Sequence, residues 1–195
     1  MNKKIESIID KMKLLEKELL DEIEKEEKKF GFKVETEGIV FNKEIRKSHR
    51  KYAKNLFRYI LDAPFLYILT APVIYGAIFP AIFLDLYLFL YQMINFRVYG
   101  IKRVKRSDYI IFDRQYLEYL NPIEKLNCMY CSYFNGLMAY ATEVSARTEL
   151  FWCPIKHAKK VPYIHRYYTM FISYGDAKEY REKLEKLRRA IKEEG

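Results

Sequence analysis

Residues 63–96, APFLYILTAPVIYGAIFPAIFLDLYLFLYQMINF, decide the fold of this chain. They contain one charged residue, Asp85, although 31% of the whole chain is charged. A helix of about 20 apolar residues is long enough to cross a bilayer core, so this run is long enough to cross twice. The alternative is a buried hairpin of a soluble protein. We rank it lower, because buried helices rarely run so far without polar residues.

The apolar run is interrupted by prolines, and its best candidate turn is residues 75–80, YGAIFP. Such a turn leaves two arms, 57–75 and 81–99, each about one bilayer thickness long as a helix. The sequence therefore predicts a membrane helical hairpin, either as two full spans or as a re-entrant loop in one leaflet. Asp85 is expected close to the far interface, or paired with Arg58 if the arms cross obliquely.

Basic residues bracket the apolar run on both sides. They are Arg46, Lys47, Arg50 and Lys51 before it, and Arg97, Lys102, Arg103, Lys105 and Arg106 after it. Lys and Arg next to membrane segments mark the cytoplasmic side. We therefore expect the inner (cytoplasmic) membrane, with both termini cytoplasmic and the basic flanks attracted to anionic lipid headgroups. Nucleic acid ranks well below this partner, because the charge flanks the apolar run instead of forming a basic face of its own.

The remaining segments predict a mainly α protein with flanking amphipathic helices. Residues 1–30 carry an apolar stripe typical of a coiled coil or surface helix, and 176–195 form a charged amphipathic helix. Residues 31–56 are a basic juxtamembrane segment with a candidate small hairpin, 57–99 the membrane hairpin, and 100–175 a cytoplasmic Cys/His region. Neither outer stripe can be buried alone. We expect them to pack on each other, on the membrane, or on a second copy as a homo-oligomer.

All three cysteines of the chain lie in one region, together with a histidine at a ligand-like spacing: Cys128, Cys131, Cys153 and His157. A Cys3His set is a common tetrahedral zinc complement, and both half-spacings suit it. Pro154 is expected to open a helix that brings His157 to the same face as Cys153, where the exposed N–H groups would stabilise a thiolate. The sequence thus predicts a metal-knuckle region, with zinc ahead of an iron or iron–sulfur centre and of a thiol–disulfide pair.

Two functions remain open at this point. Four protein ligands fill a tetrahedral site and leave no room for a reactive water, which favours a membrane-anchored scaffold or interaction protein with a structural zinc. The alternative is a membrane-bound redox or metal-dependent enzyme that uses the Cys/His cluster with Glu143 and Arg147, and with Glu149 nearby. Glu143 and Arg147 are four residues apart on an expected helix at 134–150, so a simple ion pair is the more ordinary interpretation.

The middle of the chain resembles a group of short, uncharacterised bacterial membrane proteins. The resemblance rests on DYIIFDRQYLEYLNPIEKLNCMYCSYFNG and on RTELFWCPIKHA, which carry an N-C-x-Y-C motif and an R-T-E-x-x-W-C-P-I-K-H-A motif. It covers about the middle 100 residues. It implies the apolar hairpin and the grouping of the Cys and His residues, and it implies no activity.

Overall fold

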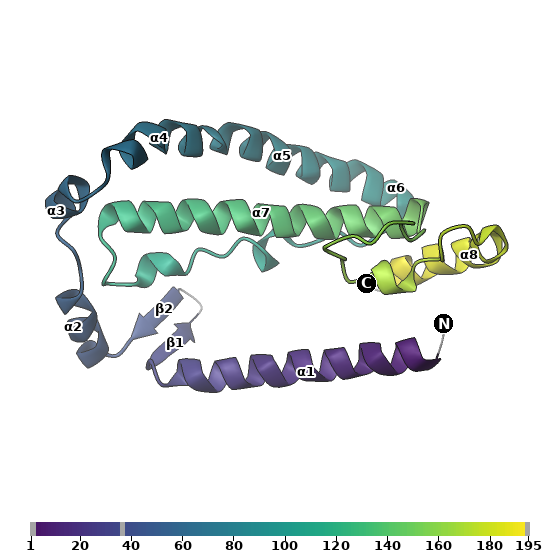
Figure 1. Ribbon diagram of the computed structural model, residues 1–195, viewed down its shortest axis with the longest axis horizontal. Coiled ribbons are helices and arrows are strands. Elements are labelled where there is room, and N and C mark those ends of the chain that lie inside the picture. The colour runs from purple at the N-terminus through teal and green to yellow at the C-terminus, as the bar shows by residue number, and fades with distance from the viewer. Residues whose placement is uncertain (1–2, 36–37, 194–195) are drawn as a thin grey trace. The chain divides into compact units, whose positions relative to one another are not determined.

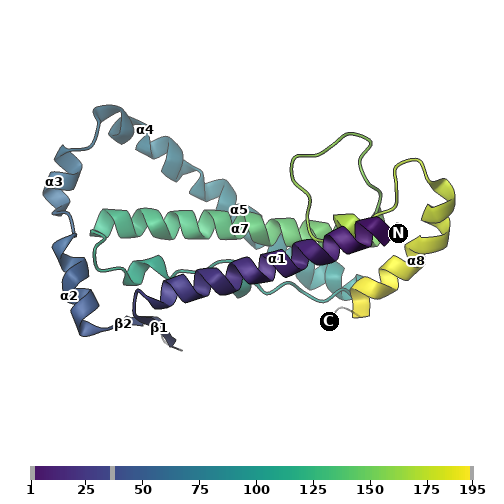
Figure 2. The same cartoon turned by 60° about the horizontal axis from the view of Figure 1, so that its bottom comes forward.

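The computed structural model describes residues 3–35 and 38–193, and these residues are mainly helical. They form two compact units. The first comprises the described residues up to Leu61 together with Asp113–Leu126, and the second comprises Asp62–Phe112 and the described residues from Asn127 onward. Figures 1 and 2 show the elements of both units, which are described separately below.

The first unit begins with α1 (Lys3–Lys28), as the apolar stripe predicted. Strands β1 (Phe32–Glu35) and β2 (Gly38–Phe41) pair antiparallel and confirm the small hairpin. Residues 42–58 predict one basic amphipathic helix. It is divided into α2 (Lys43–Lys51) and α3 (Leu56–Leu61), because residues 52–55 leave the helical conformation. The single turn η3 (Arg114–Tyr116) lies against β2.

The second unit contains α4 (Phe65–Gly76), α5 (Ile78–Tyr91), the π-helical turn η1 (Gln92–Phe96) and α6 (Arg97–Tyr99). The predicted turn at 75–80 is wrong. Ala77 has right-handed helical dihedrals (φ −64°, ψ −12°), so α4 and α5 continue in the same direction and no hairpin forms. Residues 65–99 instead form one 35-residue helical stretch. Neither Pro72 nor Pro80 reverses the chain, since proline in an apolar helix costs its own hydrogen bond without forcing a turn.

Helix α7 (Pro122–Trp152) runs alongside this stretch and in the same direction (Figures 1 and 2). Hydrogen bonds link the two helical stretches at three places: Tyr75 to Asn127, Asp85 to Tyr133, and Gln92 to Tyr140. Residue numbers rise together along both stretches, so the two are parallel. The sequence Asn121-Pro122-Ile123-Glu124 predicts a helix start with Asn as cap and Pro at the first helical position, and α7 begins there. The Asn121 side chain accepts from the N–H groups of Ile123 and Glu124, and the Glu124 carboxylate accepts from the Asn121 N–H, which is a capping box.

Two parallel helices require a connection that returns along them. Gly100 ends α6 with φ 72°, and the chain then runs back through η2 (Arg106–Asp108) toward the start of α7. Residues 109–112, for which the sequence predicts either a short strand or an interfacial segment, form no strand. The returning chain touches Gly136 of α7, where a Cβ would lie 2.5 Å from the Tyr109 carbonyl oxygen. Glycine is required here because the two backbones approach so closely.

The core of the second unit lies between these elements and α8 (Ala177–Glu193). Phe96, Leu137, Leu150 and Ile191 are essentially fully buried in it. A further single turn, η4 (Tyr168–Met170), follows the loop after α7. Asp176 with Glu179 three residues later predicts a capping box at the start of the last helix. The cap is present, since the Asp176 carboxylate accepts the Glu179 N–H at 2.8 Å. Helix α8 therefore buries its apolar stripe within its own unit.

Candidate membrane-binding surface

The outward side of α5–α6 is an almost uncharged apolar surface, which we call the outer face. Its side chains are 43–76% exposed: Phe79, Ile82, Phe83, Leu86, Tyr87, Phe89, Leu90, Met93, Ile94 and Val98. Arg97 is the one charged residue among them. An exposed apolar surface of this extent is rare on soluble monomers and marks a site that contacts a membrane or another protein.

Helix α4 extends the outer face. It has no buried residue, and its apolar side chains are exposed on every side, with Phe65 at 74% and Val73 at 77%. Figure 2 shows α4 rising away from α7. Thr70 satisfies its hydroxyl by donating to the Leu66 carbonyl oxygen one turn earlier. A helix that is apolar all round is normally surrounded by protein or by lipid.

The inward side of the same helix carries the polar groups. Asp85 is 15% exposed and receives a bidentate contact from Arg106, with Nε–Oδ1 at 2.9 Å and Nη2–Oδ2 at 2.7 Å. Tyr133 donates to the same carboxylate at 3.1 Å. The partner of Asp85 is therefore Arg106, and not Arg58, which was the alternative to a position near the far interface. The charge is neutralised from the returning segment, which passes beside it because α6 ends in a reversal.

Gln92 is the second inward polar group and is only 3% exposed. Its Oε1 accepts the Val104 N–H at 2.7 Å, and its Nε2 donates to the Tyr140 hydroxyl. It lies at the start of the π-helical turn, where one extra residue widens the helix. Sequence reasoning missed this residue, although the first uncharged polar side chain after a long apolar run was an available signal.

The two polar side chains of α5–α6 thus face inward, beside the buried Ala81, Leu88 and Phe96, while the outer face is apolar. We call this arrangement the reversed polarity of α5–α6. By length and composition, residues 65–99 make the one helix among the described residues that is apolar and long enough to cross a membrane. Only 11% of its most apolar 18-residue window is buried. The core helix of a soluble protein would be mostly buried, so the alternative of a buried hairpin is not supported.

The predicted basic flanks differ in their surroundings. Arg50 and Arg46 both bind Glu118 in the first unit, and these hydrogen bonds hold the pKa of the Glu118 carboxyl below its usual value. Lys47 and Lys51 are exposed. After the apolar stretch, Arg106 pairs with Asp85, while exposed side chains free to meet anionic groups are found at Arg97, Lys102, Arg103 and Lys105.

The structure does not bring the predicted metal ligands together. Cys128 and Cys131 lie inside α7, and Cys153 follows the end of the same helix. Cys153 follows Cys131 by 22 positions, which correspond to about 33 Å of helix at 1.5 Å per residue. The sequence predicts a tight metal-binding knuckle at Cys128 and Cys131, but the structure has a continuous helix there. Over residues 3–35 and 38–193, no group of three or more His, Cys, Asp or Glu side chains is arranged to hold a metal ion. Zinc binding therefore stays a prediction of the sequence alone.

The surroundings of Cys153 also differ from those expected. No helix opens at Pro154; Ile155 instead bridges to Ile172. Cys153 follows the C-terminal end of α7, where the unsatisfied carbonyl groups carry partial negative charge. Burial, followed by the negative charge of Glu149, raises the pKa of the Cys153 thiol. The thiol is thus disfavoured as a thiolate, whereas the sequence predicted a helix start that would favour one. His157 stacks on Tyr168.

Glu143 and Arg147 form a buried charged centre away from the cysteines. The predicted pair is present at 2.8 Å, but it is not a surface pair, since both side chains are at most 13% exposed. Arg166 and Tyr167 also contact the Glu143 carboxylate, at 2.8 and 3.3 Å. Sequence reasoning missed both residues, because they belong to an irregular loop 23 residues further along the chain.

The same centre fixes the loop after α7 to the helix. Arg147 donates to the Lys102 carbonyl oxygen, and Glu149 contacts His165 at 3.1 Å. Burial and then the charge of Glu143 raise the pKa of Tyr109. Glu143 Oε1 and Glu149 Oε2 both have protein partners. The arrangement is that of a buried network holding three segments together.

Comparison with family models, curated proteins and solved structures finds no match to this chain. The resemblance of its middle part to short bacterial membrane proteins therefore stays a prediction.

Proposed function

We propose that this protein is a membrane-attached scaffold or interaction protein that rests in one leaflet of an anionic bilayer. The observation that carries the proposal is the reversed polarity of α5–α6, with Asp85 and Gln92 inside and ten large apolar side chains outside. Lipid would cover the outer face. Each apolar side chain moved out of water contributes about 1.5–3 kcal/mol, so the outer face supplies ample binding free energy.

The path of the chain favours a helix lying in the plane of the membrane over one that crosses it. Helices α5 and α7 run in the same direction, so if both crossed, their connection would have to cross as well. That connection carries exposed charges at Lys102, Arg103, Lys105 and Asp108 and is not a regular helix. Backbone without regular hydrogen bonds is not tolerated in contact with lipid. Moreover, 35 residues of helix measure about 52 Å, well beyond the 30 Å core.

An in-plane helix also suits the charge distribution. Both basic flanks and both termini would then lie on the same side of the membrane. Basic segments next to membrane helices are usually cytoplasmic, so this would be the cytoplasmic side of the inner membrane. Exposed lysines and arginines of residues 97–105 would meet anionic headgroups, each contributing about 1 kcal/mol near the surface. The predicted one-leaflet arrangement is kept in this proposal, with a single long helix in place of the re-entrant hairpin.

The interaction part of the proposal rests on α1. Its stripe is 46–63% exposed along the helix: Ile5, Ile8, Met12, Leu15 and Leu19. Spacings of three and four residues are those of a two-stranded coiled coil. The membrane surface would then hold α1 where it pairs with a partner helix or with a second copy.

A vesicle flotation experiment tests the attachment. The full chain is mixed with vesicles of phosphatidylcholine and phosphatidylglycerol, and we expect it to float with them after an alkaline carbonate wash. A variant with Phe83→Asp and Leu90→Asp should remain at the bottom, because an aspartate costs up to about 3 kcal/mol in an apolar layer.

The matched control carries Tyr163→Asp and Tyr174→Asp, two side chains that are each 70% exposed in the same unit. It adds the same charge and should float like the parent chain. Equal flotation of all three proteins, or none by the parent, would refute the attachment through the outer face.

A depth measurement separates the in-plane helix from a spanning one. Single nitroxide labels are placed at positions 79, 83, 86, 90 and 94 in a chain whose three cysteines are replaced by serine. In-plane attachment predicts nearly equal depths at all five. A spanning helix predicts depths that rise steadily toward the bilayer centre, and that result would reject the one-leaflet arrangement while keeping the membrane attachment.

A further inference from the structure

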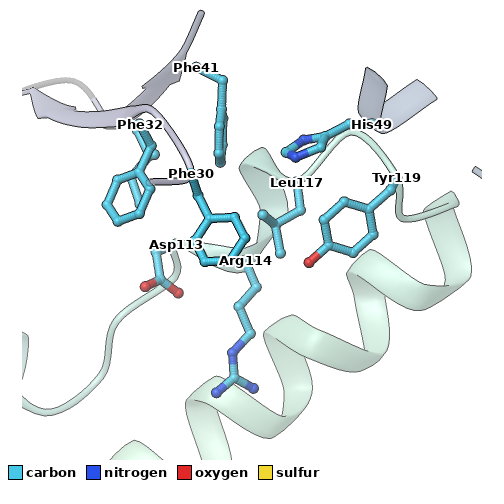
Figure 3. Close-up of a pocket in the computed structure, with 9 residues that line it drawn as sticks. Phe30, Phe32, Phe41, His49, Asp113, Arg114, Leu117 and Tyr119 are labelled. Carbon is cyan, nitrogen blue, oxygen red and sulfur yellow. The ribbon is translucent and has the colours of Figure 1, made fainter. Parts of the chain in front are cut away.

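The first unit contains a pocket of about 410 Å³ between the β-hairpin, α2 and the segment around η3 (Figure 3). Its lining is mostly apolar and ring-bearing: Phe30, Phe32, Ile39, Phe41, His49, Leu117 and Tyr119, with Asp113 and Arg114. Pockets that bind small molecules typically measure about 300–1,000 Å³ and are lined in this way. The pocket belongs to the first unit, whereas the outer face of α5–α6 belongs to the second.

One wall of the pocket is a chain of ring contacts. Phe32 lies 6.0 Å from Phe41, Phe41 lies 5.0 Å from His49, and His49 lies 5.1 Å from Tyr119, measured between ring centroids. The last two contacts are edge-to-face, an arrangement in which rings attract each other. An inserted ring could extend this pattern, so the wall suits an aromatic ligand.

His49 supplies the polar group of the wall. Its Nδ1 is buried and has no hydrogen-bond partner among the described residues. Figure 3 shows the imidazole pointing from α2 toward Phe41, above Leu117. A buried polar nitrogen without a partner is costly, so a ligand group that bonds to it gains affinity beyond its apolar contacts.

The charged residues at the pocket do not favour a charged ligand. Asp113 and Arg114 follow each other in sequence and carry opposite charges, and Figure 3 shows both charged groups directed away from His49. Arg46 and Arg50 lie on the same helix as His49, but both bind Glu118. Those contacts fix α2 to the segment that carries Leu117 and Tyr119, so the two sides of the pocket are held in place.

We propose that this pocket binds a small, uncharged molecule made of an aromatic ring and a hydroxyl group. The ring would lie among Phe30, Phe41 and Leu117. The hydroxyl would bond to Nδ1 of His49, and because a hydroxyl both donates and accepts, it suits either tautomer of the imidazole. The proposal does not depend on membrane attachment.

The test compares 4-ethylphenol with ethylbenzene, which differ by the hydroxyl group, on the full chain in lipid nanodiscs. Calorimetric titration should give at least tenfold tighter binding of 4-ethylphenol. His49→Phe should remove this preference by weakening 4-ethylphenol binding, while ethylbenzene binds as before. The control is His157→Phe, the same substitution on a histidine of the other unit that stacks on Tyr168, and it should keep the preference.

Nuclear magnetic resonance on the parent chain keeps the test decisive if His49→Phe fails to fold. Addition of 4-ethylphenol should shift the imidazole signals of His49 and leave those of His157 unchanged. Equal affinity for both probes, a preference that survives His49→Phe, binding of neither probe, or unshifted His49 signals would each overturn the proposal.

Discussion

Helices α5 and α8 belong to the same unit and have opposite polarity. Helix α8 buries Leu184 and Ile191, at 9% and 1% exposure, and turns its charges outward. Helix α5 turns its apolar side chains outward and buries polar atoms against α7 and the returning segment. Water therefore suits the exposed charged face of α8, whereas exposing the apolar face of α5 to water is unfavourable. The difference teaches that the surface of this unit combines a polar face on α8 with an apolar face on α5.

Arg188 shows how the polar face of α8 is built. Its Nε donates to the Phe151 carbonyl oxygen at 2.9 Å, near the end of α7, and its guanidinium lies 5.2 Å from the Phe151 ring centroid. A cation is stabilised both by the ring face and by the carbonyl groups of a helix end. The polar face of α8 thus also contributes to packing.

The largest difference is expected between two isoleucines. Ile191→Ala in α8 removes a fully buried side chain and should lower the free energy of unfolding by about 2–5 kcal/mol. Ile82→Ala in α5 removes one that is 54% exposed, and the change should stay below about 1 kcal/mol in detergent micelles. Denaturant unfolding followed by circular dichroism measures both. Similar losses for the two variants would break the comparison.

The fold could be predicted from the sequence where the signal was local. The stripe of α1, the hairpin, the Asn121 cap and the Asp176 cap each depend on residues at most a few positions apart, and all are present. The turn at 75–80 could not be predicted correctly. Glycine and proline permit a turn, but a turn forms only if the two arms pack on each other, and here α5 packs on α7 instead.

The candidate site was less predictable than the fold. The extent of the apolar run and its basic flanks were evident from composition, but the inward direction of Asp85 and Gln92 depends on partners 12–48 residues away. The cysteine spacing suggested one metal site, although a helix was already expected at 134–150 within the interval from Cys131 to Cys153. The helix that fills this interval keeps the two ends about 33 Å apart.

A medium effect is expected at Gln92. Gln92→Leu keeps a similar size but leaves the Val104 N–H and the Tyr140 hydroxyl without their partner. An unsatisfied buried polar group costs about 1–3 kcal/mol, so the free energy of unfolding should fall by at least that amount. Met93→Leu, one residue further on the outer face, is the control and should change stability little. Hydrogen exchange at the Val104 amide, which should become much faster in Gln92→Leu only, locates the effect.

The smallest difference concerns the charged pairs of the two helices. Asp85→Asn removes a largely buried carboxylate from a bidentate contact with Arg106, and we expect a loss of about 1–2 kcal/mol, because charge-assisted bonds are stronger than neutral ones. Glu182→Gln in α8 removes the partner of Lys178, a pair whose side chains are 86% and 61% exposed. Exposed pairs of this spacing contribute about 0.3–0.5 kcal/mol, and salt screens them.

Unfolding in 0.05 M and 0.5 M salt distinguishes the two cases. The effect of Glu182→Gln should vanish at high salt, whereas that of Asp85→Asn should persist, since protein shields the Asp85 carboxylate from ions. Loss of both effects at high salt would mean that Asp85 is as open to water as the charges of α8. Asp85 would then not be a shielded, inward-facing group, which contradicts the reversed polarity of α5–α6.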